Sequence, residues 1–375
     1  MEYYIICDKK EAMKSAAKRF PKSTFAVCCG PVKTSAALEQ SKNVVFYMKN
    51  RNLTNAAVQS GALQNKEVFV YPYDLAGVSE PIRIDPSKPR LDYLETEISY
   101  RCNLNCRGCC DFCNLETDSG FYDFDTYCRD LSRIGELFWG VEKFRLMGGE
   151  PLLNPRLADY AEQARALFPD CDIRIVTNGL LIPALSKNIL LRLKTCKVSF
   201  DISNYPTTGK IRRRIKQKLA DADIGYHFSV PVRFFFKTIL ANSTDTPERS
   251  FGNCIFSRCH MMGNGKLSPC SYAHCISRFN RFFKTDYPED DYFDLYTQDL
   301  NGYIINDAFS RPHAFCRYCA GGMVPIRWRQ GVISDRAKKE DWLINDSFFS
   351  TTILPGVQSL LKKSAVRLRY FVQDR

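Results

Sequence analysis

Between residues 3 and 72, short apolar runs alternate with segments whose apolar residues recur at helical spacing. The β-branched and aromatic runs lie at 3–7, 24–29, 43–49 and 67–72, and the helix-type segments at 11–20 and 34–40. This alternation predicts a small α/β layer with a parallel sheet over residues 1–78. The turn after the first run, CDKKEAM, has no glycine and carries the acidic Asp8 where an anion would sit. We therefore expect a degenerate Rossmann-like layer that binds no dinucleotide.

A proline-rich, charged stretch at 79–90 is predicted to be a linker. A longer alternation of the same kind occupies 91–245. Its candidate strands lie at 93–99, 143–148, 172–177, 197–203, 226–230 and 233–240. Helix-type segments such as 126–138 and 155–168 separate most of these strands. The pattern predicts an α/β fold, a partial (β/α)6 TIM-like barrel, whose chemistry lies at the C-terminal ends of its strands.

The chain changes character after the predicted barrel. Residues 246–330 hold six cysteines in short segments without clear periodicity, which predicts a separate cysteine-rich domain. Residues 331–375 are expected to form a helical tail. Within it, residues 357–371 are a candidate amphipathic basic helix that either packs on its own protein or lies on a membrane surface.

Composition adds a cellular compartment to this picture. The first twenty residues lack the pattern of a signal peptide, and no apolar run reaches the roughly 18 residues of a membrane span. We therefore expect a cytoplasmic protein without a transmembrane segment. In a reducing compartment the chain's 17 cysteines are expected to be metal ligands or buried thiols and not disulfides.

The charge balance points to anionic partners. The chain carries 53 Lys and Arg against 41 Asp and Glu, a formal net charge of +12. Part of the excess is concentrated in KIRRRIKQK at 210–218, which favours an anionic substrate or surface over the alternative of solubility alone. Nucleic acid is not the expected partner, because the basic runs lack the interleaved aromatic residues on which bases stack.

Residues 102–113, CNLNCRGCCDFC, contain five cysteines in a loop that follows a predicted strand. Cys102, Cys106 and Cys109 have the spacing C-x3-C-x2-C, and three thiolates converge at that spacing. An iron–sulfur cluster with one open iron fits three ligands best. The alternatives are a zinc site completed by Cys110 or Cys113, or an incidental group of thiols.

The sequence MGGEP at 147–151 ends the next predicted strand. Together with the cysteine loop it resembles the radical SAM superfamily. The resemblance implies that Cys102, Cys106 and Cys109 hold a [4Fe–4S] cluster whose open iron binds S-adenosylmethionine. It also implies that Gly148, Gly149 and Glu150 meet the methionyl amine of that cofactor, for which a carboxylate is a suitable acceptor.

Softer landmarks of the family follow along the chain. Asn178, in the TNG of 177–179, and Asp201 and Ser203 at the end of a later strand lie where the resemblance implies hydrogen bonds to the cofactor, although Asn-Gly is also common turn chemistry. The aromatic residue that many members carry before the third cysteine is replaced by Gly108. The adenine must then be held elsewhere, for example by backbone or by Phe112. Cys110 and Cys113 are not expected to be ligands in the active state.

A second cysteine set resembles the twitch form of the SPASM auxiliary-cluster extension and implies a second [4Fe–4S] cluster. Its ligands, in order of preference, are expected to be Cys259, Cys270, Cys316 and Cys319, with Cys254 as the competing first ligand and Cys275 after it. Structural zinc is the alternative, and His260 or His274 would then be further ligands.

The CNLNCRGC form looks like a branch of the superfamily often encoded beside polysaccharide assembly genes. This resemblance implies an oxidoreductase or epimerase that generates a 5′-deoxyadenosyl radical and abstracts hydrogen from a sugar, a polyol or a carrier-linked, anionic substrate. The alternatives are a peptide-modifying enzyme and a non-catalytic iron–sulfur or zinc protein. The implied partners are S-adenosylmethionine and an external one-electron donor such as flavodoxin or ferredoxin. No residue stands out as a catalytic acid or base.

Overall fold

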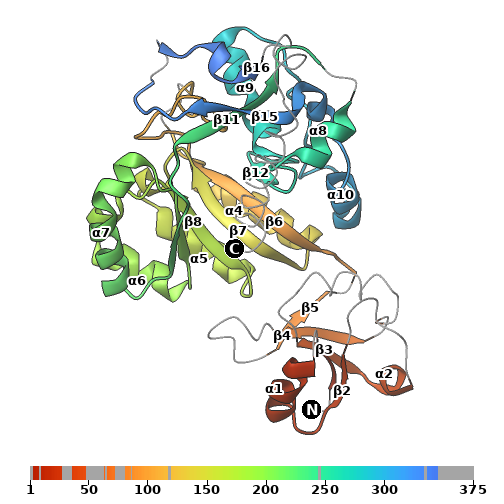
Figure 1. Cartoon of the computed structure of the whole chain (residues 1–375). Coiled ribbons are helices and arrows are strands. Elements are labelled where there is room, and N and C mark those ends of the chain that lie inside the picture. The colour runs from red at the N-terminus through yellow and green to blue at the C-terminus, as the bar shows by residue number, and fades with distance from the viewer. Residues whose placement is uncertain are drawn as a thin grey trace.

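Three β-sheets organise the chain in the computed structural model (Figure 1). The structure describes residues 3–7, 10–27, 36–47, 63, 66–71, 81–85, 87–116, 120–243, 246–332 and 336–344. The acidic turn position Asp8 and the helix expected at 357–371 lie outside these residues. None of the described helices is both long enough and apolar enough to cross a membrane.

The N-terminal sheet has five strands in the order β2-β1-β3-β4-β5. Its strands are β1 (Tyr4–Cys7), β2 (Thr24–Val27), β3 (Asn43–Tyr47), β4 (Glu67–Tyr71) and β5 (Ile82–Ile84). The first four are parallel, and β5 runs antiparallel to β4. The helices of this layer are α1 (Lys10–Arg19) and α2 (Ala36–Gln40). The predicted α/β class is confirmed here, and buried apolar side chains of β1, β3 and β4 form its core.

The central sheet carries the long parallel run. Its first five strands lie side by side in sequence order: β6 (Arg90–Ser99), β7 (Gly140–Gly148), β8 (Asp172–Thr177), β9 (Ser199–Ile202) and β10 (Tyr226–Phe228). The helices that alternate with them are α4 (Phe124–Leu137), α5 (Leu157–Leu167), α6 (Lys187–Thr195) and α7 (Pro206–Asp221). They cover one face of the sheet (Figure 1). The chain order of strands and helices follows the sequence prediction.

Helix starts agree with local sequence signals. Asp123 caps α4 by accepting from the Thr126 N–H, Ser186 caps α6 in the same way, and Pro206 occupies the first turn of α7. Apolar side chains at alternate strand positions, such as Phe144 and Phe200, pack under these helices. The residues at the intervening positions of each strand therefore face the other side of the sheet.

The strand expected at 233–240 forms, but not as the sixth strand of a barrel. It is β11 (Phe234–Leu240), which pairs antiparallel with β15 (Cys319–Arg327) and parallel with β16 (Leu343–Ile344) in a separate sheet. The preceding connection contains Pro231, which has no N–H, and the Val232 N–H is bonded to the Asn204 carbonyl. The chain thus leaves the central sheet after β10, and the (β/α)6 detail of the prediction is not confirmed.

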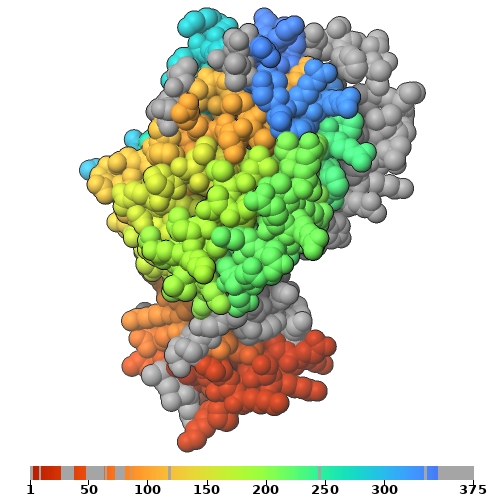
Figure 2. All heavy atoms as spheres, turned by 90° about the vertical axis from the view of Figure 1, so that its left-hand side faces the viewer, coloured from red at the N-terminus to blue at the C-terminus, as the bar shows by residue number. Residues whose placement is uncertain are grey.

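The cysteine-rich region completes the central sheet from its other edge. β12 (Met261–Gly263) runs parallel to β6, and β13 (Lys266–Ser268) and β14 (Phe293–Asp294) add antiparallel strands. The helices here are α8 (Pro247–Asn253), α9 (Ser271–Phe283) and α10 (Gly302–Phe309). Short 3-10 turns lie at Pro151–Leu153, Ile182–Ala184, Ala314–Tyr318 and Lys339–Asp341. Figure 2 shows the N-terminal sheet as a body below the rest of the chain.

Candidate functional site

The first cysteine loop leaves the C-terminal end of β6 and holds Cys102, Cys106 and Cys109. Two of these sulfurs accept N–H donors: Leu104 N lies 3.4 Å from the Cys102 Sγ, and Trp328 Nε1 lies 3.2 Å from the Cys106 Sγ. Burial raises the pKa of Cys102 to about 12 and also raises the pKa of Cys106. The neighbouring Cys109 raises the pKa of both thiols as well. The three predicted ligands thus influence one another electrostatically. N–H···S bonds are among the features that tune a bound cluster.

The two glycines of MGGEP are required by the contact between β7 and the cysteine loop. Gly148 has a φ of +127°, and a Cβ there would lie 2.3 Å from the Ser99 carbonyl oxygen. A Cβ on Gly149 would lie 2.1 Å from the Arg101 oxygen. The N–H groups of Gly149 and Glu150 donate to the Ser99 and Arg101 carbonyls at 2.8 and 2.7 Å. Because the two glycines have no Cβ, the backbone at the start of the cysteine loop can lie directly against this turn.

Glu150 joins the MGGEP turn to the TNG motif. Its fully buried carboxylate accepts from the Thr177 hydroxyl at 2.6 Å, from the Asn178 N–H at 2.9 Å and from the Leu152 N–H at 3.1 Å. Burial raises the pKa of Glu150 to about 7, against the lowering effect of these hydrogen bonds. A carboxylate with two oxygens and about four lone-pair sites still has capacity for a cationic donor.

The TNG motif also contacts the cysteine loop itself. The Asn178 side-chain amide donates to the Asn103 Oδ1 at 2.7 Å and lies 4.0 Å from the Cys102 Sγ. Glu150 and Asn178 therefore connect three sequence-distant motifs. Ser203 lies near them, since its N–H donates to the Thr177 carbonyl at 2.9 Å.

Asp201 is placed differently from the other predicted cofactor contacts. Its carboxylate forms ion pairs of 3.0 Å with both Arg145 and Arg174. These arginines lie on β7 and β8, on the face of the sheet opposite the helices. Asp201 thus balances charge on that face.

The backbone conformation and the space at Gly108 disfavour the aromatic residue that many family members carry at this position. Its φ is +65°, and a Cβ would lie 2.9 Å from the Asp341 carbonyl oxygen, so an aromatic side chain is disfavoured by both strain and space. The suggestion that Phe112 holds adenine is wrong, because Phe112 is fully buried and packs on Tyr272, Phe279 and Trp342.

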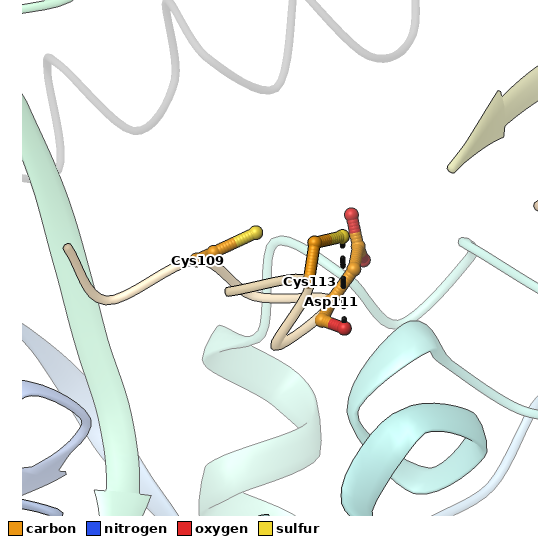
Figure 3. Close-up of side chains that lie close together, drawn as sticks. All are labelled: Cys109, Asp111 and Cys113. Carbon is orange, nitrogen blue, oxygen red and sulfur yellow. Dashed lines mark hydrogen bonds between the residues drawn. The ribbon is translucent and has the colours of Figure 1, made fainter. Parts of the chain in front are cut away.

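Cys109, Asp111 and Cys113 form a second grouping in the same loop (Figure 3). One ligand atom from each lies within 4.8 Å of the others, and Glu97, Asp111 and Cys275 form a similar buried group. A hydrogen bond from Cys113 lowers the pKa of Cys109 to about 7. Cys113 also lies 3.9 Å from the Asp111 carbonyl oxygen. The first loop thus brings Cys109 next to a further thiol and a carboxylate, which are also potential metal ligands.

The second cysteine set lines a pocket between α8, α9 and β15. The cysteines in its wall are Cys254, Cys270, Cys316 and Cys319. Three of their sulfurs accept backbone N–H groups: Cys254 from Phe256 at 3.2 Å, Cys316 from His313 at 3.4 Å, and Cys270, which caps α9, from Ala273 at 3.5 Å. This is a donor set of four thiols with N–H···S support.

Cys259, the preferred first ligand by sequence, is not in the wall of this pocket. It is buried, and its pKa is raised by burial and then by Glu95. Cys275 also lies outside the wall, next to Glu97 at 3.6 Å. The pocket wall thus includes Cys254 and not Cys259, the first ligand preferred from spacing.

The two histidines named as alternative zinc ligands have other contacts. The His260 Nδ1 lies 3.1 Å from the Pro269 carbonyl oxygen, and its ring stacks on Phe309. The His274 Nδ1 lies 3.0 Å from the Ser268 hydroxyl. Burial lowers the pKa of each histidine to about 3, so both are neutral. Neither lines the pocket, whereas Asp291 and His313 do, beside the four cysteines.

The face of the central sheet opposite the helices is polar where a barrel interior is normally aliphatic. Glu95 accepts from the Tyr93 hydroxyl at 2.7 Å, and burial raises the pKa of Glu95 to about 7. Lys143 is 9% exposed, and burial and then Arg174 lower its pKa to about 8. Among the described residues, no hydrogen bond or ion pair engages its ammonium group. The Arg145 Nε likewise is buried without a hydrogen-bond partner.

Sequence reasoning missed three residues that contact the first loop. They are Asn103, which receives the Asn178 amide, Trp328, which donates to Cys106, and Arg278, which donates to the Asp111 carbonyl at 2.8 Å. Asn103 stands beside Cys102 and could have been suspected from its position. Trp328 and Arg278 carried no signal, because each lies more than 150 residues further along the chain.

Comparison with known proteins agrees with the site's geometry. Residues 96–221 match the family model described as the radical SAM superfamily. The "GTP 3',8-cyclase" of Clostridium acetobutylicum is 31% identical over 133 residues, which cover 34% of this chain and 40% of the relative. That of Crocosphaera subtropica is 33% identical over 125 residues, covering 32% and 36%. The chain thus matches two fifths or less of these relatives' length.

Two solved structures give weaker likenesses. BtrN in complex with AdoMet and 2-DOIA has a TM-score of 0.36 and 14% identity, covering 63% of this chain and all of BtrN. Native anSMEcpe with bound AdoMet and Cp18Cys peptide has a TM-score of 0.30 and 18% identity, covering 37% of this chain and 42% of that chain. Residues 96–221 are a radical SAM domain. The resemblance that the motifs predicted is thus confirmed over residues 96–221.

Proposed function

We propose that this protein is a radical SAM enzyme in which Cys102, Cys106 and Cys109 hold a [4Fe–4S] cluster. The observation that carries the proposal is the connected network at the loop: Glu150 binds the TNG backbone, and Asn178 reaches both Asn103 and Cys102. When bound, the reduced cluster supplies the electron that cleaves S-adenosylmethionine to methionine and a 5′-deoxyadenosyl radical, which abstracts hydrogen from a substrate C–H bond.

The chain's own residues would hold and orient this cofactor. Glu150, when ionised, would accept a hydrogen bond from the methionyl amine, and its pKa near 7 makes that interaction depend on pH. The Thr177 hydroxyl and the Asn178 N–H fix the orientation of the Glu150 carboxylate before the cofactor arrives. Such preorganisation removes reorganisation cost at the reacting centre.

A second [4Fe–4S] cluster bound by Cys254, Cys270, Cys316 and Cys319 is the next part of the proposal. Support comes from the four thiols in one pocket wall and from the backbone donors to three of their sulfurs. Four thiols also suit zinc, so the metal itself must be measured. The twitch-type interpretation of this region depends on that measurement.

The favoured substrate is a polar molecule that carries an anionic group, such as a sugar or polyol on a phosphate-bearing carrier. The support is the polar sheet face, where the Lys143 ammonium and the Arg145 Nε lack hydrogen-bond partners among the described residues. Buried donors without partners favour a ligand with acceptor oxygens. Oxidation and epimerisation are both compatible with this face, and an external one-electron donor is required by either reaction.

A phosphorylated nucleoside is the second candidate substrate. The curated relatives are named GTP 3',8-cyclase, and the same cationic side chains suit a phosphate. Their likeness covers about a third of this chain. A peptide substrate lacks a comparable supporting feature on the sheet face.

The first experiment is anaerobic reconstitution, followed by measurement of iron, zinc and 5′-deoxyadenosine formed with dithionite. The parent protein should cleave S-adenosylmethionine, and the combined variant Cys102→Ala, Cys106→Ala, Cys109→Ala should not. That variant should keep about four irons, as one remaining [4Fe–4S] cluster requires. Zinc in place of iron, together with no cleavage by the parent, would overturn the proposal.

The two candidate first ligands of the second site offer a matched pair. Cys254→Ala should reduce iron by about four per chain, whereas Cys259→Ala should keep the full amount. The opposite result would return Cys259 to the ligand set. Retention of iron in both variants would argue against a second cluster.

A further inference from the structure

Eight exposed basic side chains form a surface group on and beside α7, which we call the basic patch. Five belong to α7 and three to the ends of β11 and β15: Lys210, Arg212, Arg213, Arg214, Lys216, Arg233, Arg327 and Arg329. None of them forms an ion pair with another described residue. Figure 2 shows α7, in green, on the molecular surface next to the blue C-terminal segment that includes β15. The KIRRRIKQK run is thus part of a larger cationic surface.

Two aromatic residues connect the basic patch with the first cysteine loop. Tyr205 is the residue before α7, and its ring stacks on Trp328 with a centroid distance of 5.1 Å. Trp328 follows β15 and donates its indole N–H to the Cys106 Sγ at 3.2 Å. Arg327 and Arg329 flank this tryptophan in sequence. Two stacked rings beside the basic patch therefore lead to a proposed cluster ligand.

The packing of α7 favours a protein partner over a lipid surface. Ile215 and Leu219 are fully buried, and Ile211 packs against the same core, so the helix has no free apolar face to insert between lipids. Exposed apolar side chains lie instead beside the patch, with Val230 at 65% and Phe234 at 52% exposure. A cationic surface with a few apolar groups at its edge suits an acidic protein.

We propose that the basic patch docks an acidic one-electron carrier protein beside Cys106. In this step the reduced carrier loses one electron and the cluster at Cys102, Cys106 and Cys109 gains it, with Tyr205 and Trp328 between the two partners. The inference rests on the proposed function, because it requires a cluster at these cysteines. It adds to that function the place of electron entry and the charge of the donor.

The test compares two double variants with the same change in charge. Arg213→Glu with Arg327→Glu alters both segments of the patch, and Lys14→Glu with Lys18→Glu alters exposed residues of α1 in the N-terminal layer. Each reconstituted protein is mixed anaerobically with a reduced acidic flavodoxin, and bleaching of the cluster absorbance is followed by stopped flow. Dithionite replaces the flavodoxin in a parallel series.

The patch variant should be reduced by flavodoxin about tenfold or more slowly at low salt, because electrostatic steering accelerates association by that order or more. The difference should shrink at about 1 M salt, where the Debye length is about 3 Å. The α1 variant should match the parent, and dithionite should reduce all three proteins alike. Binding of flavodoxin, measured by calorimetry, should weaken in the patch variant only.

Equal rates for the parent and the patch variant would overturn the inference, as would equal slowing by the α1 variant. Loss of dithionite reduction in the patch variant would mean damage to the cluster. In that case the variant Lys210→Glu with Lys216→Glu, which changes α7 alone, replaces it, and slower reduction by flavodoxin supports the inference while an unchanged rate overturns it. If the patch variant loses binding to phosphatidylserine vesicles while its reduction by flavodoxin is unchanged, the patch binds a lipid surface and the inference is overturned. If dithionite reduces no cluster in the parent, the proposed function fails instead.

Discussion

Arg278 is the side chain whose removal should disturb the site most, because it neutralises two buried carboxylates at once. Its guanidinium donates to both oxygens of Glu97, at 3.0 and 2.7 Å, and to Glu116 at 2.8 Å. The side chains of Arg278, Glu97 and Glu116 are 8%, 4% and 7% exposed. A further bond of 2.8 Å reaches the Asp111 carbonyl in the cysteine loop.

The expected magnitude follows from this burial. Arg278→Ala leaves Glu97 and Glu116 buried with little compensation, a change that typically costs about 3–5 kcal/mol of stability. Arg281 provides the matched control, since it also pairs with Glu116, at 3.3 Å, but its side chain is 60% exposed. An exposed pair of this kind contributes about 0–1 kcal/mol. The two substitutions on one helix should therefore differ by several kcal/mol.

Urea titration of the anaerobically reconstituted proteins, followed by circular dichroism, measures the difference in the free energy of unfolding. Iron content is measured on the same samples, because release of the Asp111 carbonyl should also loosen the cysteine loop. In a Glu97→Gln background the cost of Arg278→Ala should be smaller, since fewer charges remain unpaired. Equal losses for Arg278→Ala and Arg281→Ala would refute this reasoning.

Two further substitutions test the turn at the site and the polar sheet face. In Gly149→Ala the new Cβ would lie 2.1 Å from the Arg101 oxygen, so the cysteine loop should be displaced and about four irons lost. Gly252→Ala, which has open space around its Cβ, should keep its iron. Equal iron contents in the two variants would refute the steric argument. Burial raises the pKa of Glu95 to about 7, above its unfolded value of 4.5, so its contribution to stability is complete below about pH 4.5 and is lost as pH rises through about 7. Glu95→Gln should remove up to roughly 3 kcal/mol of this pH-dependent loss of folding stability. Urea midpoints measured at pH 5 and pH 8 should therefore differ less in the variant than in the parent.

The sequence predicted the parts of the site that depend on local pattern. Strands β6 to β9 carry apolar residues at alternate positions, and three motifs stand at their C-terminal ends, so the parallel order brings Cys102, Glu150 and Asn178 together. The tight glycine turn at 148–149 was also visible in the sequence. In the structure these glycines allow a close approach of the Ser99–Cys102 backbone.

The sequence could not predict features that depend on pairing between distant segments. The pairing of β12 with β6 sets Met261, two residues after the buried Cys259, opposite Glu95. Counting residues before Gly265 does not reveal that pairing, and it placed Cys259 ahead of Cys254. β11 likewise left the central sheet because β15 and β16 offered partners about 80 and 100 residues later, a choice that local strand propensity does not encode.

Helix α9 links the two cysteine groups by direct contact. Its N-terminal cap, Cys270, lies in the wall of the second pocket, and Cys275 and Arg278, further along the same helix, contact Glu97. Arg278 then holds the Asp111 carbonyl two residues after Cys109. Because a helix transmits displacement along its axis with little bending, a change at the second pocket would shift the loop that holds the first set of ligands. The buried ion pairs of Arg278 with Glu97 and Glu116 therefore connect the helix at the second pocket to the first cysteine loop, a positional role that stability alone does not require of buried charge.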